Sequence, residues 1–153
     1  IPSVSEREVN NAAIRARAIA RKRNGYGAGM GDVLLPEDQT VVSLWEDELI
    51  NTFREAGYRV VGPNDPDYAA ATPVSIEIHQ YWSWMKMGFW QGHVGNISEI
   101  KIDGNLGKAT NSHVILNNYE SPGLGAVFDE DWIDASHRGL KALMVKVKTY
   151  LKL

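Results

Sequence analysis

The chain has no cysteine, which excludes disulfide bridges, zinc-thiolate sites and thiol nucleophiles. It also has no apolar run of the roughly 18 residues that a membrane-spanning helix needs. Charge of either sign is nearly balanced, because 16 Lys and Arg residues stand against 19 Asp and Glu residues and give a formal net charge of -3. The overall electrostatic field therefore gives no reason to expect a nucleic-acid partner.

What the sequence does contain is enough apolar material for one core. Hydrophobic residues make up 44% of the 153 positions, which is enough for the core of a single domain. The chain is too short for two domains. We therefore expect one domain over residues 1–153, with an extended N-terminal segment at 1–12. Because the first residue is Ile1 rather than methionine, we expect either a removed leader peptide or a chain trimmed at its start.

The strongest secondary-structure signal is at 74–102, where apolar and polar residues alternate in two runs. This period of two predicts a long antiparallel hairpin that turns around 86–88. One phase of the first run, interrupted only by Gln80, carries Val74, Ile76, Ile78, Trp82 and Trp84. The shared phase of the second run carries Trp90, Val94, Ile100 and Ile102.

Two stretches have the periodicity of amphipathic helices, at about 37–56 and 129–151. Pro36 suits the first turn of one helix and Gly57 its C-terminal stop, while Asp129 suits the N-cap of the other. The apolar stripe of the first helix is expected to comprise Val42, Trp45, Leu49, Phe53 and Ala56. Core positions expected across the two helices are Trp45, Leu49, Phe53, Leu140, Leu143 and Val147.

Shorter apolar runs at 58–61 and 108–119 predict two further strands. The predicted fold class is therefore α/β in the α+β sense. It is a sandwich in which a mainly antiparallel sheet, with the hairpin 74–102 at its centre, is covered by the two amphipathic helices on the same face.

The N-terminal stretch 5–23 is compatible with a helix and with a strand. Ser5 and Glu8 have capping-box spacing, which favours a helix, whereas 14–18 alternates small apolar and basic residues as an edge strand would. The glycine-rich stretch 24–31 predicts a flexible connector, because it lacks the spacing and the lysine of a phosphate-binding loop.

Aromatic residues crowd the predicted hairpin turn. The candidate binding residues there are Tyr81, Trp82, Trp84, Lys86, Phe89 and Trp90. Phe89 and Trp90 flank the turn and are expected to be exposed, which is typical of a contact with a partner protein, a glycan or a lipid headgroup layer. Lys86 suits an anionic surface. For Trp82 and Trp84 the alternative is that they continue the core phase of the hairpin.

Other candidate sites are weaker. A basic edge is formed by Arg15, Arg17, Arg21 and Arg23 around Lys22, although such a run is usually a solvated face. Three histidines on predicted strands, His79, His93 and His113, lack the close spacing of metal ligands, and no serine has the context of a nucleophile elbow. We therefore expect no metal ion, no cofactor and no catalytic residue.

The order of elements supplies a family resemblance. A helix ending in Glu-Ala-Gly-Tyr at 55–58 is followed by a strand, Gly-Pro-Asn at 62–64, the runs VSIEIHQYWSW and NISEIKID, a further strand and a terminal helix. This order over 41–151 resembles the YajG-like bacterial lipoproteins. The resemblance implies an α/β sandwich, an early arginine-rich strand at about 14–22, and no enzymatic activity. The lipid-bearing cysteine of that pattern would lie upstream of Ile1.

The resemblance implies a non-enzymatic component of the bacterial cell envelope, located in the periplasm and anchored to the outer membrane. We expect the chain to act in assembly or binding through its sheet edge and its aromatic hairpin tip. The expected partner is an envelope protein, a membrane or glycan surface, or a second copy of the chain. The alternative is a small-ligand or glycan-binding module, or a hydrolase, with a pocket between the hairpin and a helix.

Overall fold

The computed structural model describes residues 11–23, 26, 28–106 and 112–152. Its strands are β1 (Ala18–Arg23), β2 (Gly29–Leu34), β3 (Val74–Met87), β4 (Gly92–Gly104) and β5 (His113–Glu120). Its helices are α1 (Ala12–Arg15), α2 (Val41–Glu55) and α3 (Asp129–Leu151), with a 3-10 turn η1 (Tyr68–Ala70). The strands form one sheet in the order β2-β1-β3-β4-β5, in which only the β1–β3 pairing is parallel. The predicted α+β sandwich is thereby confirmed.

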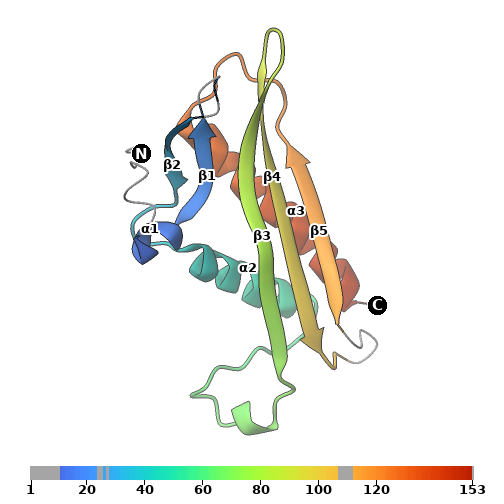
Figure 1. Cartoon of the computed structure of the whole chain (residues 1–153). Coiled ribbons are helices and arrows are strands. Elements are labelled where there is room, and N and C mark those ends of the chain that lie inside the picture. Colours follow the sequence, from blue (N-terminus) through green and yellow to red (C-terminus); the bar gives the residue numbers. More distant parts are fainter. Residues whose placement is uncertain (1–10, 24–25, 27, 107–111, 153) are drawn as a thin grey trace.

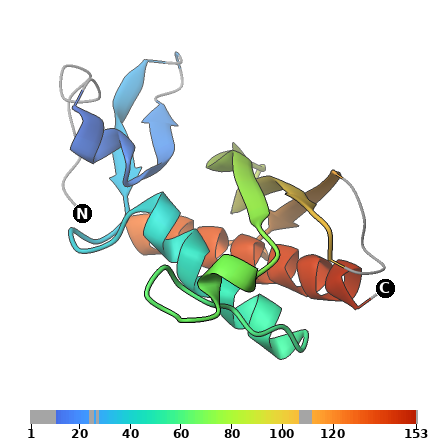
Figure 2. The same ribbon diagram turned by 90° about the horizontal axis from the view of Figure 1, so that it is seen from below.

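Both long helices pack on the same face of the sheet, and no described helix covers the other face (Figures 1 and 2). The helices are joined to each other by an ion pair in which Lys148 Nζ lies 2.7 Å from Glu55 Oε2. The β1–β2 ribbon meets β3 through a single residue pair, Ala20 and Ser83, so it diverges from the long strands on either side of that point. The molecule is therefore a long three-stranded ribbon backed by two helices, with a short two-stranded ribbon attached at one side (Figure 1).

Helix α2 begins later than predicted. Residues 36–39 form a turn, and the N-cap is Thr40, whose Oγ1 accepts a hydrogen bond from the Ser43 amide at 3.0 Å. Ser43 Oγ in turn accepts one from the Thr40 amide at 2.9 Å, which completes a capping box. The stripe also differs at its start, because Val42 is 65% exposed and Leu44 is buried in its place.

Helix α3 has the predicted bounds, but the carboxylate that accepts a backbone hydrogen bond at its start is that of Asp131 and not that of Asp129. Asp129 is the first helical residue rather than the N-cap, and the Phe128 amide donates to Asp131 Oδ2 at 2.7 Å. An acidic side chain at this point also stabilises the positive end of the helix dipole. The acidic residues 129–131 therefore belong to the helix start.

Near the N-terminus the structure contains both predicted elements, a short helix α1 followed by strand β1. The glycine-rich stretch is a connector only in part, because Gly29 to Leu34 form β2, with Gly31 at a φ of 118° that favours glycine. The strand predicted at 58–61 is wrong, because these residues form no strand and the sheet consists of β1 to β5. The prediction for segment 1–12 falls almost entirely outside the described residues.

The hairpin β3–β4 contains an irregularity that changes which face its residues occupy. Ile78 pairs with Ile100 and Gln80 pairs with Glu99, so His79 is an extra residue on β3. Because strand side chains alternate with a period of two, one extra residue moves every later side chain to the opposite face. Beyond His79, Tyr81 and Ser83 consequently face the helices and are buried.

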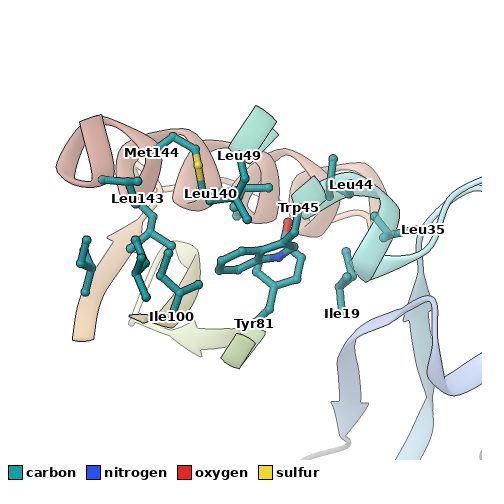
Figure 3. Packing of buried hydrophobic residues seen from close by; sticks show 14 of the residues in the cluster. Ile19, Leu35, Leu44, Trp45, Leu49, Tyr81, Ile100, Leu140, Leu143 and Met144 are labelled. Carbon is teal, nitrogen blue, oxygen red and sulfur yellow. The ribbon is translucent and has the colours of Figure 1, made fainter. Parts of the chain in front are cut away.

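The core lies between this face of the sheet and the two helices (Figure 3). At its centre the rings of Trp45 and Tyr81 meet edge to face, with centroids 5.4 Å apart. The predicted core positions are confirmed, since all of them are buried: Trp45, Leu49, Phe53, Leu140, Leu143 and Val147.

A row of polar side chains, which we name the polar seam, crosses the core where α3 lies closest to the sheet. The buried members are Ser83, Asn96, Ser98, Asn117 and Ser136. Ser83 Oγ lies 2.7 Å from Ser136 Oγ and accepts a bond from Asn96 Nδ2 at 3.1 Å. Asn96 Oδ1 accepts from Ser98 Oγ, and Asn117 Nδ2 donates to the Gly139 carbonyl oxygen at 3.1 Å. These side chains thus satisfy one another and the helix backbone, as buried polar groups must.

Replacing Leu143 by alanine should lower the free energy of unfolding by about 2–5 kcal/mol, because the side chain is 0% exposed and its removal leaves a cavity. Val145→Ala, two residues along the same helix at a position 65% exposed, is the matched control and should change it by less than about 0.5 kcal/mol. Urea denaturation measures both values. A loss below about 1 kcal/mol for Leu143→Ala would contradict the placement of α3 on the sheet.

Gly139→Ala should destabilise the domain by about 1–3 kcal/mol, although alanine is the better helix former in isolation. A Cβ at Gly139 would lie 2.2 Å from Asn96 Oδ1, and Asn96 is held by its bonds to Ser83 and Ser98. Gly125→Ala is the control, because a Cβ there meets nothing within 4 Å. Thermal melts compare the two variants. An increased melting temperature for Gly139→Ala would contradict the prediction and show that Asn96 moves aside at little cost.

Candidate functional site

The tip of the hairpin is a short chain reversal that a single backbone hydrogen bond closes. The last cross-strand pairs are Lys86 with His93 and Met87 with Gly92, and the Gly88 amide donates to the Gln91 carbonyl oxygen at 2.7 Å. The turn therefore spans 88–91, slightly later than the 86–88 predicted from the sequence. Its backbone is fixed by hydrogen bonds up to the point where the chain reverses, so side chains there are presented from a rigid support.

The side chains at this turn are apolar and exposed. Phe89 is 89% exposed and Trp90 83% exposed, as predicted, and their rings contact each other edge to face with centroids 4.7 Å apart. Met87 is 68% exposed on the adjoining strand end. We name the group formed by Met85, Lys86, Met87, Phe89 and Trp90 the tip surface. Apolar side chains so exposed and so close together are typical of a contact site.

A second segment supports the tip from one side. Leu124 forms a two-way backbone bridge with Gly92, both hydrogen bonds measuring 2.9 Å, so 121–125 runs beside the hairpin end (Figure 1). The Gln91 side chain lies against Gly123, where there is no room for a Cβ. The tip is thus held in place, and its only long uncharged polar side chain is turned toward the body of the protein.

Tyr81 does not belong to the tip surface. It is 7% exposed, packs against Trp45 in the core, and burial raises the pKa of its hydroxyl. The sequence prediction of Tyr81 as a binding residue is therefore wrong, because the extra residue at His79 turns it toward the helices.

Trp82 and Trp84 lie on the face of the sheet opposite to the helices, where they are 41% and 36% exposed. The core placement suggested by the hairpin phase is wrong for both, for the same reason that Tyr81 is buried. The Trp84 indole lies over Gly95, since a Cβ at that glycine would come within 2.5 Å of the ring. The two tryptophans thus line the open sheet face, away from the turn.

The histidines are separated in the structure. His79 Nδ1 lies 3.0 Å from Glu99 Oε1 and His79 Nε2 lies 3.3 Å from Glu77 Oε2. These hydrogen bonds, that to Glu99 first, raise the pKa of His79. His93 contacts the Ser121 carbonyl oxygen, and His113 stacks on Tyr150. Within the described part of the chain, no group of three or more His, Asp or Glu side chains is arranged to hold a metal ion.

The basic stretch is mostly used inside the fold. Arg17 donates to the Leu35 carbonyl oxygen at 2.7 Å and Arg21 pairs with the buried Asp32 at 2.8 Å. Lys22 pairs with Asp129 at the start of α3, while Arg15 and Arg23 are exposed. Because β1 lies between β2 and β3, the predicted basic edge is wrong as an edge.

The alternative ligand site finds little support. A hollow of about 560 Å³, open to solvent, lies between the end of β5 and the first half of α3. Of its acidic residues, Asp131 accepts the Phe128 amide, Asp134 pairs with Arg138, and Glu120 Oε1 lies 3.7 Å from His93 Nδ1. Asp131 and Asp134 are therefore occupied by structural contacts.

Comparison of the chain with models of known protein families found no match, and no curated protein matched it either. Across the described residues, no helix is both long and apolar enough to cross a bilayer.

The contacts of His79 predict a pH-dependent contribution to stability. A histidine with a raised pKa stabilises the fold below its ordinary pKa of about 6.5, and this contribution is lost as the pH rises through the raised value. Replacing His79 by glutamine should therefore destabilise the protein more at about pH 5.5 than at about pH 9. Denaturation midpoints at the two pH values measure this, and an equal difference at both would contradict it.

Proposed function

We propose that this chain is a non-enzymatic component of the bacterial cell envelope that acts by binding, with the tip surface as its contact. The observation that carries the proposal is the exposure of Phe89 and Trp90, at 89% and 83%, on a turn whose backbone is fixed. Neither ring contributes to the core, so neither is explained by the stability of the fold.

The energetics favour binding by this surface. A large aromatic side chain buries about 150–250 Å² in a contact, and apolar burial is worth about 25 cal/mol per Å². Two such rings therefore offer several kcal/mol when a partner covers them. Because the turn is already ordered by the Gly88–Gln91 hydrogen bond, little conformational entropy is lost on binding.

The setting in the envelope rests on the resemblance to the YajG-like lipoproteins, with periplasmic location and outer-membrane anchoring through a cysteine upstream of Ile1. The arginine-containing strand β1 precedes the long helix α2, which is in keeping with that resemblance. A role without catalysis is supported by the structural contacts of Asp131 and Asp134 in the hollow and of Asp32 in the sheet.

Replacing Phe89 and Trp90 together by serine should leave the melting temperature nearly unchanged, because both side chains lie outside the core. Binding to isolated cell-envelope fragments should weaken by about 2 kcal/mol or more, roughly 30-fold, the usual scale for an interface anchor. Cosedimentation of the purified, unlipidated chain with such fragments measures the binding.

The matched control is the double variant Tyr68→Ser with Val145→Ser, which removes exposed apolar area elsewhere, at 52% and 65% exposure. It should bind as the original chain does. If the Phe89 and Trp90 double variant unfolds, the rings belong to the core. If it stays folded and binds normally, the tip surface is not the contact.

A further inference from the structure

We infer that the partner of the tip surface is the interfacial layer of an anionic lipid bilayer, into which the hairpin tip inserts its aromatic side chains. This inference rests on the proposed function and names its partner. It is carried by the chemistry of the turn, its closed backbone and its position in the molecule.

The side chains at the turn suit the bilayer interface, where polarity falls from the headgroups toward the acyl chains. Phe89 and Met87 are wholly apolar, and Trp90 combines a large apolar ring with an indole N–H that favours headgroup depth. Within 85–91, Lys86 is the only ionisable side chain, so no carboxylate would have to be dehydrated on insertion. A lysine beside an apolar wedge reaches the anionic headgroups with its ammonium group while its methylenes follow the apolar side chains.

Most backbone amide and carbonyl groups near the tip are hydrogen-bonded, which lowers the cost of moving them into a medium of low polarity. Unpaired amide and carbonyl groups are costly in lipid, but the strands remain paired up to Met87 and Gly92. The Gly88 amide is bonded to the Gln91 carbonyl oxygen, and the Gln91 side chain lies against Gly123. The Gly88 carbonyl, the Gln91 amide and the backbone groups of residues 89 and 90 are left for the headgroup layer to hydrate.

The position of the tip allows insertion without burial of the body. The turn lies at one extreme of the long molecule, beyond the ends of both long helices (Figure 1). The opposite end carries ion pairs of Arg59 with Asp65 and Asp67, and of Lys101 with Asp103. Residues 85–91 are therefore apolar with a single cation, whereas the opposite end carries several ion pairs, and this difference orients the chain relative to a membrane surface.

A protein pocket is the less favoured partner for the same group. Protein contacts surround an apolar centre with a polar rim that exchanges hydrogen bonds with the partner. Within 85–91 the rim would have to come from Lys86 alone, because Gln91 is turned toward the body.

The test uses the full, unlipidated chain and vesicles of phosphatidylcholine, alone or mixed with phosphatidylglycerol. Flotation measures binding, and brominated acyl chains report insertion by quenching tryptophan fluorescence. We expect binding to the mixed vesicles that falls at least about tenfold when Phe89 and Trp90 are both replaced by serine. The Tyr68→Ser with Val145→Ser variant should bind unchanged. Lys86→Gln should weaken binding to the mixed vesicles and leave binding to phosphatidylcholine alone the same.

Because the chain has five tryptophans, Trp90→Phe assigns the signal. It should float with the vesicles but lose most of the quenching. Retention of the full quenching would place Trp82 or Trp84 in the membrane and overturn the inference, as would vesicle binding that the double serine variant retains. The original chain could bind no vesicles while the double serine variant no longer binds envelope fragments. The inference of a lipid partner is then wrong and the proposed function stands. If both assays show no effect of the double variant, both fail.

Discussion

One extra residue in β3, His79, decides how the side chains of the central hairpin are divided between the two faces of the sheet. Before it, Ile76 and Ile78 point toward the helices; after it, Tyr81 and Ser83 do. Without the extra residue, two indoles would have to fit under α3 and a tyrosine would stand on the open face. At the bulge the His79 side chain bonds Glu99 and Glu77 outside the core, so the extra residue has polar partners there.

The polar seam follows from that division. Because Ser83 faces the helices, it meets Asn96 on β4 and Ser136 on α3, and these three side chains satisfy one another. Small and hydrogen-bonded residues let the helix approach the sheet closely, to the point that Gly139 has no room for a methyl group beside Asn96. These polar groups have hydrogen-bond partners at only one position of α3 along the sheet, and a shift of the helix would leave them unpaired. They therefore fix the position of α3 more strictly than apolar packing alone would.

The parts of the fold that depend on local periodicity could be predicted from the sequence, and those that depend on a single residue could not. The stripe at Leu140, Leu143 and Val147 repeats over many turns, so no single error displaces it. An alternating pattern says nothing of where one residue has been inserted. The sequence therefore predicts the wrong face for Tyr81, and the core alternative that it leaves open for Trp82 and Trp84 is wrong too. The start of α2 was missed because Pro36 resembles a first-turn residue, whereas the cap forms where Thr40 and Ser43 bond each other. The exposure of Phe89 and Trp90 was predictable, since residues that flank a tight turn lie beyond the reach of a covering helix.

The turn at the end of the hairpin lies outside the core of the protein. The core extends past the polar seam to Val94 on β4 and Trp132 on α3, and beyond them the hairpin is held by its own backbone pairing and by the bridge from Gly92 to Leu124. Side chains at the turn can therefore change without disturbing the packing of α2 and α3. Exposed aromatic residues at such positions lower solubility and lie outside the core, which is the physical basis for proposing a contact with another surface. A stiff hairpin with its apolar residues at the end gives that contact a fixed distance from the body of the protein.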